Sequence, residues 1–112
     1  MKLVVAIIKP HVVEQVNEVL GGLDVNGITL TEVRGHGRQR GHNEVYRGGE
    51  YHVDFLPKVR IEVLTSDGLA DAVANTIVEK ARTGKIGDGK LWILPVDHSV
   101  RIRTGEVGEE AL

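Results

Sequence analysis

The 112-residue chain contains no cysteine, which excludes disulfide bonds and thiolate chemistry. Aromatic residues are nearly as scarce, with one Phe, one Trp and two Tyr. An RNA-binding module that stacks bases on the aromatic side chains of an open sheet is therefore a poor fit. No apolar run approaches the ~18 residues of a membrane-spanning helix, and no signal-peptide core stands near the first residue. We expect a cytoplasmic protein.

The chain also lacks a large excess of either positive or negative charge. The formal net charge is −2, which gives no general attraction to nucleic acid, and we expect no nucleic-acid partner. The length favours a single domain spanning residues 1–112. A domain of this size buries limited apolar surface, so oligomerisation would help to stabilise it.

What the chain does contain is a regular alternation of strand and helix patterns. Strand-like apolar runs cover residues 3–8, 28–34, 59–64 and 91–96, and helical stripes run over 12–20 and 70–81. The order β-α-β-β-α-β is that of the α+β ferredoxin-like fold, the split βαβ arrangement. Both helices would cover one face of an antiparallel sheet. Because the strands carry Val, Ile and Leu rather than alternating charges, we expect other subunits to bury the second face.

The segment from Gly35 to Asp54 breaks this pattern. Glycines alternate there with charged and polar residues, and neither a period of 2 nor one of 3.6 persists. We expect a loop of roughly twenty residues, and a loop of that length in a small domain is usually functional or disordered.

The segment Thr83–Lys90 concentrates three glycines and two lysines between a predicted helix and a predicted strand. Glycines let a backbone approach a ligand closely, and clustered N–H groups bind anions. Gly84, Gly89 and Lys90 match the start of the P-loop pattern, but Leu91 stands where that motif has a hydroxyl for magnesium. The segment also leaves a helix instead of opening one. A phosphate cradle and a plain glycine C-cap with a turn both remain open.

Two arginines near the C-terminal end, Arg101 and Arg103, are spaced to share one face of a strand. Alone, that spacing is more typical of a solvated face than of a phosphate clamp. If the two arginines lie opposite a phosphate-binding loop, a phosphate clamp becomes the favoured interpretation, because such a loop needs further positive charge.

Five segments together resemble the PII nitrogen-regulatory signal proteins. They are Gly37–His42, Val45–Tyr51, Asp54–Lys58, Thr83–Lys90 and Arg101–Glu106. The match covers nearly the whole chain without gaps, and the motifs recur in the family's order. The resemblance implies a signal protein and not an enzyme. It also implies a homotrimer with a nucleotide site in each cleft between neighbouring subunits, where ATP and ADP compete.

The resemblance implies that residues of two subunits form this site. The loop Gly87–Lys90 would hold the phosphates, Arg101 and Arg103 would reach them from the adjacent subunit, Arg38 would pair with the γ-phosphate side, and Gln39 would ligate Mg2+. The adenine would lie near Ile7, Thr29, Gly35, Glu62 and Leu64. The full implied set for ATP and ADP is Ile7, Thr29, Gly35, Gly37, Arg38, Gln39, Glu62, Leu64, Gly87, Asp88, Gly89, Lys90, Arg101 and Arg103.

The resemblance also implies a second effector, 2-oxoglutarate, which would complete the coordination of the magnesium. Its pocket would be formed by Gly37, Gln39, Arg40, Gly41, Lys58 and Gly87. Lys58 would meet a carboxylate. Arg40 stands where lysine is usual in the family, which keeps the charge but changes the geometry of the contact.

Residues 37–55 correspond to the family's T-loop, which docks onto target proteins. The implied partners are an ammonium transporter, which would recruit the protein to the membrane, and enzymes of nitrogen metabolism. Tyr51 matches the tyrosine to which a nucleotidyltransferase attaches a uridylyl or an adenylyl group. Gly49 stands where some relatives carry a phosphorylated serine, so that modification is excluded here. A phosphate loop at 83–90 and a C-terminal loop at 98–112 complete the implied division of the chain.

The alternative function is a nucleotide-hydrolysing enzyme that uses the same cleft between subunits. Phosphoryl transfer needs a positioned base or nucleophile beside the γ-phosphate. The implied site offers lysines, arginines and one glutamine, with Asp88 as the only nearby acid. This composition favours holding ATP over cleaving it. We therefore expect two states of the T-loop, one set by Mg-ATP with 2-oxoglutarate and the other by ADP.

Overall fold

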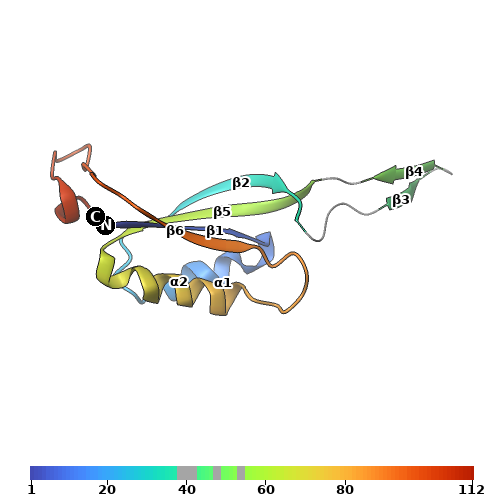
Figure 1. Ribbon diagram of the computed structural model, residues 1–112, viewed down its shortest axis with the longest axis horizontal. Coiled ribbons are helices and arrows are strands. Elements are labelled where there is room, and N and C mark those ends of the chain that lie inside the picture. Colours follow the sequence, from blue (N-terminus) through green and yellow to red (C-terminus); the bar gives the residue numbers. More distant parts are fainter. Residues whose placement is uncertain (38–42, 47–48, 53–54) are drawn as a thin grey trace.

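The computed structural model describes residues 1–37, 43–46, 49–52 and 55–112. Its elements in chain order are β1 (Lys2–Ile8), the 3-10 turn η1 (Pro10–Val12), α1 (Val13–Leu20), β2 (Thr29–Gly35), β3 (Asn43–Tyr46), β4 (Gly49–His52), β5 (Leu56–Thr65), α2 (Asp67–Ala81), β6 (Lys90–Pro95) and η2 (Gly108–Ala111). Figure 1 shows both helices on one side of the main sheet.

The main sheet has the strand order β2-β5-β1-β6. Every neighbouring pair is antiparallel, with Val4 of β1 opposite Val63 of β5 on one side and opposite Ile93 of β6 on the other. Two helices that cross over one face of such a sheet define the ferredoxin-like fold. The predicted α+β class and the βαββαβ order are therefore confirmed.

The core lies between the sheet and the two helices. Alternate residues of β1 point into it, and the helices meet them with side chains at three- and four-residue spacing. The buried members are Val4, Ala6, Ile8, Val12, Val16, Leu20, Ile61, Val63, Ala70, Val73, Ala74, Ile77 and Ala81. Fully burying one valine or leucine stabilises the fold by about 1.5–3 kcal/mol, so this cluster fixes which face of the sheet the helices cover.

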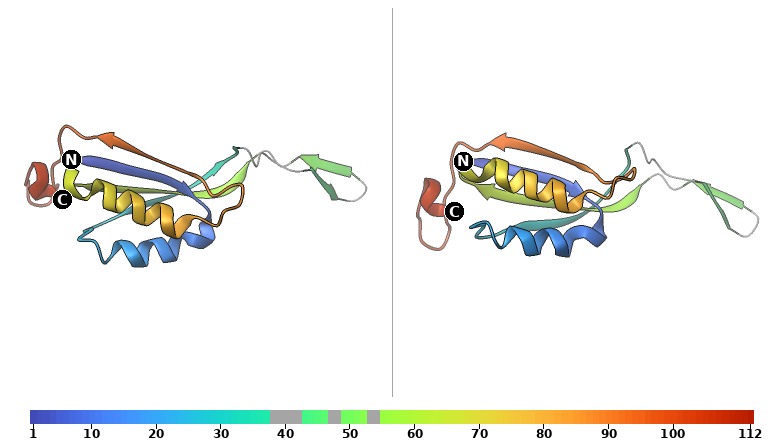
Figure 2. Two further views of the ribbon diagram at one scale, coloured as in Figure 1. Left: turned by 60° about the horizontal axis from the view of Figure 1, so that its bottom comes forward. Right: turned by 90° about the horizontal axis from the view of Figure 1, so that it is seen from below.

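The opposite face of the sheet, called here the uncovered face, is covered by no described helix, because both helices lie on one side of the sheet in Figure 1 and in front of it in the right view of Figure 2. It presents the other parity of each strand, including Leu3, Val5 and Ile7 of β1. Leu64 and Leu94 are large apolar side chains on this face that remain exposed. The single chain thus leaves one face of the sheet without a covering layer, as the sequence analysis predicted.

The predicted long segment between β2 and β5 is confirmed, and within it the structure adds a short hairpin that the sequence analysis did not predict. β3 and β4 form a separate antiparallel hairpin in which Asn43 lies opposite His52 and Tyr46 opposite Gly49. Strands of four residues are too short for a period of 2 to show, and a hairpin ladder needs no buried face. Valine and tyrosine nevertheless favour strands, and both occur in this segment. Residues 38–42, 47–48 and 53–54 lie outside the described part of the chain.

The segment after β6 folds back on itself. Arg101 and Glu106 are linked by a backbone hydrogen bond of 2.8 Å, and Gly105 donates to the carbonyl of Arg101 over 2.8 Å. Gly105 adopts a φ of 76°, which closes the turn and which glycine tolerates without strain. The prediction that Arg101 and Arg103 share a strand face was therefore wrong, because a turn runs between them. Among the described residues, no helix is long and apolar enough to cross a membrane.

Candidate functional site

The loop between α2 and β6 is closed by the carboxylate of Asp88. Its Oδ2 accepts the N–H groups of Thr83 and Gly84, each over 2.8 Å, and its Oδ1 accepts the hydroxyl of Thr83. Lys9 Nζ lies 3.2 Å from Asp88 Oδ1 and 3.2 Å from Thr83 Oγ1. We call this group, formed by Asp88, Thr83, Gly84 and Lys9, the Asp88 clasp.

The clasp keeps Asp88 ionised. The hydroxyl of Thr83, followed by the two backbone N–H groups and Lys9, holds the pKa of the Asp88 carboxyl well below its usual range. The Asp88 side chain therefore accepts hydrogen bonds within its own loop. Within the described part of the chain, the loop's internal hydrogen bonds use the N–H groups of Thr83, Gly84 and Lys85, so those of residues 87–89 are available for an anion.

The far end of the loop packs against the end of β1. Gly89 has a φ of 104°, and a Cβ built there would lie 1.7 Å from the carbonyl oxygen of Ile7. Only glycine fits this position. The next contact comes from β5, where Lys58 Nζ donates to the carbonyl oxygen of Gly87 over 2.6 Å. Burial, then the neighbouring charge of Lys9, lowers the pKa of Lys58, and Asp88 opposes the shift.

Strand register arranges the uncovered face in three rows that run across the strands. The loop-end row contains Thr31, Arg60, Ile7 and Lys90; the middle row contains Thr29, Glu62, Val5 and Trp92; and the apolar row contains Leu64, Leu3 and Leu94. Successive rows are two residues apart along each strand, or about 7 Å. Positive charge therefore lies at the end next to the loop, and apolar surface lies at the other end.

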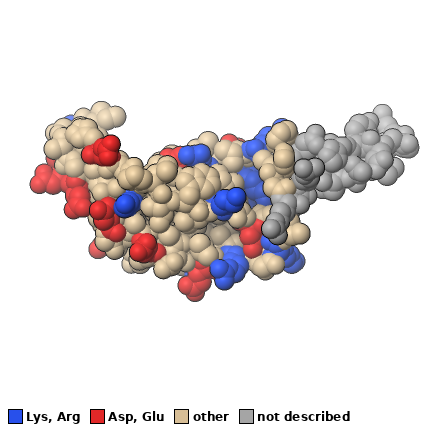
Figure 3. All heavy atoms as spheres, viewed as in Figure 1, with Lys and Arg blue, Asp and Glu red and all other residues tan. Residues whose placement is uncertain are grey.

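A surface view agrees with this division. On the face shown in Figure 3, most Lys and Arg side chains lie toward the end where β2 finishes, and most acidic side chains lie toward the C-terminal segment. An anion would therefore be drawn toward the loop end of the sheet.

The structure brings most of the predicted site residues together. Ile7, Thr29, Glu62 and Leu64 share the uncovered face, and Gly87–Lys90 borders its loop end. Gly35 ends β2, and Gly37 follows it closely. Four predicted residues, Arg38, Gln39, Arg40 and Gly41, lie outside the described residues, and Tyr51 lies in β4 with its side chain outside the description.

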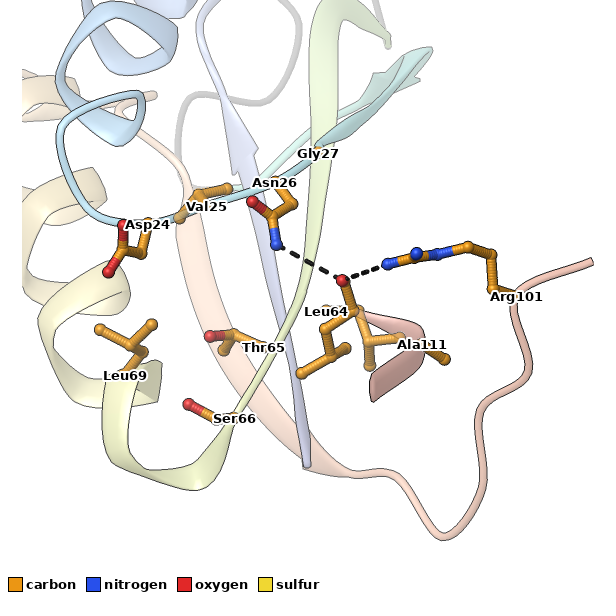
Figure 4. Close-up of a pocket in the computed structure, with 11 residues that line it drawn as sticks. Asp24, Val25, Asn26, Gly27, Leu64, Thr65, Ser66, Leu69, Arg101 and Ala111 are labelled. Carbon is orange, nitrogen blue, oxygen red and sulfur yellow. Dashed lines mark hydrogen bonds between the residues drawn. The ribbon is translucent and has the colours of Figure 1, made fainter. Parts of the chain in front are cut away.

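Arg101 and Arg103 are not brought to the loop within one chain. The C-terminal segment lies at the opposite end of the sheet (Figure 1). The guanidinium of Arg101 contacts Glu106 Oε1 at 3.2 Å and the carbonyl oxygen of Leu112 at 2.7 Å. Asn26 Nδ2 donates to the same carbonyl over 3.4 Å (Figure 4). A cavity of about 460 Å³, lined also by Leu64, lies beside this contact.

Sequence reasoning missed Lys9, Arg60 and Trp92 as members of this surface. Lys9 directly follows β1, so its position at the loop end could be inferred once β1 and the loop were placed together. Arg60 shares the parity of Glu62 in β5, which was the available signal. The pairing of strands that sets these neighbours was not visible in the sequence.

Comparison with known proteins identifies the family. The model of the family described as nitrogen regulatory protein P-II matches residues 1–106. The chain belongs to the P-II family. Similar proteins include the nitrogen regulatory proteins P-II of Rhizobium etli and Haemophilus influenzae, at 52% and 53% identity, and P-II 1 of Escherichia coli K12, at 51%. Each alignment spans 100% of both chains.

As a P-II protein, the chain is a nitrogen regulatory signal protein and not an enzyme. Proteins of this family act by binding effectors. The clasped loop and the cationic end of the uncovered face are the described parts of the chain whose charge and open N–H groups suit an anionic ligand.

Proposed function

We propose that this P-II protein senses ATP, ADP and 2-oxoglutarate and regulates nitrogen assimilation by docking its T-loop, residues 37–55, onto target proteins. The observation that carries the proposal is the clasped loop itself. Its glycine amides border a sheet face that carries Arg60 and Lys90 in the adjacent row. Amides and cations arranged around one concavity are what a polyphosphate requires.

The proposed nucleotide site extends from the loop along the uncovered face. The phosphates lie at Gly87–Lys90, and the adenosine lies toward Thr29, Glu62 and Leu64. The described carboxylate nearest the phosphates, Asp88, is committed to Thr83 and Lys9. A magnesium ion would therefore be held by phosphate oxygens and by the side-chain oxygen of Gln39, because no free carboxylate of the loop can serve. The metal would screen the phosphate charge from the T-loop base.

A homotrimer completes the site in this proposal. The C-terminal segment, which carries Arg101 and Arg103, lies at the far end of its own sheet (Figure 1), so a neighbouring subunit would supply these cations. The exposed apolar side chains of the uncovered face, Leu64 and Leu94, give association a hydrophobic driving force. Three subunits arranged cyclically would form three equivalent sites.

In the same proposal, 2-oxoglutarate binds at the base of the T-loop. Its pocket combines Gly37, Gln39, Arg40 and Gly41 with Lys58 and Gly87. Lys58 already contacts Gly87 of the phosphate loop, so a carboxylate that attracts Lys58 also acts on the loop. Linkage then requires ATP and 2-oxoglutarate to strengthen each other's binding equally.

The T-loop would deliver the signal. We propose that an ammonium transporter and enzymes of nitrogen metabolism recognise it, and that a transporter partner recruits the protein to the membrane. A nucleotidyltransferase would attach a uridylyl or adenylyl group to Tyr51, adding bulk and negative charge that block docking.

Titration calorimetry tests the effector part. We expect 2-oxoglutarate to bind in the presence of Mg-ATP and to bind weakly with ADP. Lys90→Gln should weaken ATP binding, while Lys80→Gln, which removes the same charge from the exposed side of α2, should not. Equal binding of 2-oxoglutarate with either nucleotide would refute the coupling. No affinity for ATP or ADP would refute the function as a whole.

The docking part needs a separate experiment. Partner capture with ATP plus 2-oxoglutarate should differ from capture with ADP. Prior nucleotidylation of the wild-type protein should abolish capture, and Tyr51→Phe should resist that treatment. Identical sets of captured proteins under both effector conditions would contradict control by the T-loop.

A further inference from the structure

Val5 lies in the middle row of the uncovered face, yet its exposed fraction is 0%. No helix covers this face, so a side chain of the sheet itself must exclude water from Val5. The register places Glu62 of β5 on one side of Val5 and Trp92 of β6 on the other. Arg60 contacts both of these residues.

The Arg60 guanidinium is held from two directions. Its Nε donates to Glu62 Oε1 over 2.6 Å, and its Cζ lies 6.0 Å from the centre of the Trp92 ring. These contacts carry the side chain from β5 across β1 toward β6, above Val5. We call this arrangement the Arg60 bridge. It places a side chain over the position of Val5 in the register, and it holds one oxygen of the Glu62 carboxylate.

The second carboxylate oxygen of Glu62 could bind a ligand. The Arg60 and Glu62 side chains are 37% and 31% exposed, so Glu62 can still accept a hydrogen bond from a ligand. Glu62 lies in the middle row, with the cationic loop-end row on one side and the apolar row on the other. In a nucleotide, the ribose likewise lies between the charged phosphates and the flat base.

The row spacing of about 7 Å matches this order of chemical groups. With the phosphates at the loop and the base against Leu64, the ribose falls beside Glu62. A carboxylate in that position accepts hydrogen bonds from ribose hydroxyls, as the acidic residue of dinucleotide-binding folds does. Arg60 is the residue that determines where this carboxylate points.

We propose that Arg60 is a positioning residue that fixes Glu62 to receive a ribose hydroxyl of the bound nucleotide. The inference rests on the proposed nucleotide function and adds sugar recognition to it. A partly exposed ion pair contributes little to stability. If the pair of Arg60 and Glu62 had only that structural role, replacing Arg60 would not change how well the protein distinguishes ATP from its deoxy analogues.

The test compares ATP with 2′-deoxy-ATP and 3′-deoxy-ATP by titration calorimetry on the assembled protein. We expect the wild type to prefer ATP to at least one deoxy analogue by about tenfold, the effect of one hydrogen bond to a charged group. Arg60→Gln and Glu62→Gln should bring this ratio close to one. Arg60→Lys should give an intermediate ratio, because lysine keeps the charge but not the planar fork.

A second measurement reports the Arg60 bridge directly. Trp92 is the only tryptophan of the chain, so its fluorescence emission should change in Arg60→Gln without any nucleotide. Lys80→Gln is the matched loss of charge and should alter neither the emission nor the ratio. If Arg60→Gln fails to fold, Arg60→Lys and the wild-type comparison still decide the question.

The outcomes separate the two proposals. A wild type that binds ATP and both deoxy analogues equally overturns the role of Glu62 and Arg60 but leaves the nucleotide function intact. An Arg60→Gln protein that keeps full discrimination overturns the positioning role alone. A wild type without affinity for adenine nucleotides overturns both.

Discussion

Lys58 Nζ donates a hydrogen bond of 2.6 Å to the carbonyl oxygen of Gly87. This contact joins β5 to the loop before β6. Lys58 is the proposed partner of the 2-oxoglutarate carboxylate, and Gly87 belongs to the proposed phosphate loop. Occupancy of one subsite can therefore alter the geometry of the other through a single direct contact.

The first prediction follows from this contact. Lys58→Gln should reduce the affinity for 2-oxoglutarate by about tenfold or more, because a charge-assisted hydrogen bond is lost. It should also weaken ATP binding, since Gly87 loses its partner. Titration calorimetry measures both constants. Lys80→Gln, which removes a charge from the exposed side of α2, is the control, and unchanged ATP affinity in Lys58→Gln would contradict the link.

The second prediction concerns alkaline pH. Burial and the charge of Lys9 lower the pKa of Lys58 from 10.5, so the ammonium loses its proton at a lower pH than an ordinary lysine does. Affinity for 2-oxoglutarate should therefore begin to fall below pH 10.5, while binding to an unperturbed lysine would persist. A pH series of titrations in the wild type and in Lys58→Arg checks this, because arginine stays charged throughout.

The third prediction uses two glycines of one loop. Gly89→Ala should destabilise the protein by about 3 kcal/mol or more, since its Cβ would meet the Ile7 carbonyl at 1.7 Å. Gly84 also has a positive φ, of 84°, but nothing lies within 4 Å of its Cβ position. Gly84→Ala should therefore cost only about 1 kcal/mol. Equal losses in chemical denaturation would show that the close approach to β1 is not what requires Gly89.

The fourth prediction addresses the Asp88 clasp. Asp88→Asn should raise the dissociation constant for ATP by about tenfold, because the loop loses its ionic closure to Lys9. Asp71→Asn, on the exposed side of α2, is the matched control. Since the folded pKa of Asp88 is depressed, the clasp should be complete above the ordinary carboxylate range near pH 4. It should be lost only as pH falls through the lowered value, so wild-type binding that weakens at pH 5 through this group would be inconsistent.

The fifth prediction tests assembly through the uncovered face. Leu94→Asp should dissociate the trimer, because it places a charge where apolar surface is to be buried. Val78→Asp on α2 is the control, since Val78 is 38% exposed and Leu94 is 45% exposed. Light scattering should give three times 12.2 kDa for the wild type and the control, and 12.2 kDa for Leu94→Asp. A wild type that runs as a monomer would refute the assembly.

The sequence by itself determined the order and the kinds of element in the main domain. The continuous apolar run of β1 is typical of a buried strand, and apolar residues of α1 recur at three- and four-residue spacing because a helix buries one stripe of its surface against the core. It also carried the motifs of the family. It did not reveal β3 and β4, because strands of four residues each are too short for a period of 2 to show.

Only the tertiary structure decided how the site is held together. Lys9 and Thr83 are separated by 74 positions, and no periodicity links them. Arg60 reaches Trp92 only because β1 lies between β5 and β6. Sequence patterns record which face of an element is buried, whereas strand order and register decide which charged side chains become neighbours on the other face.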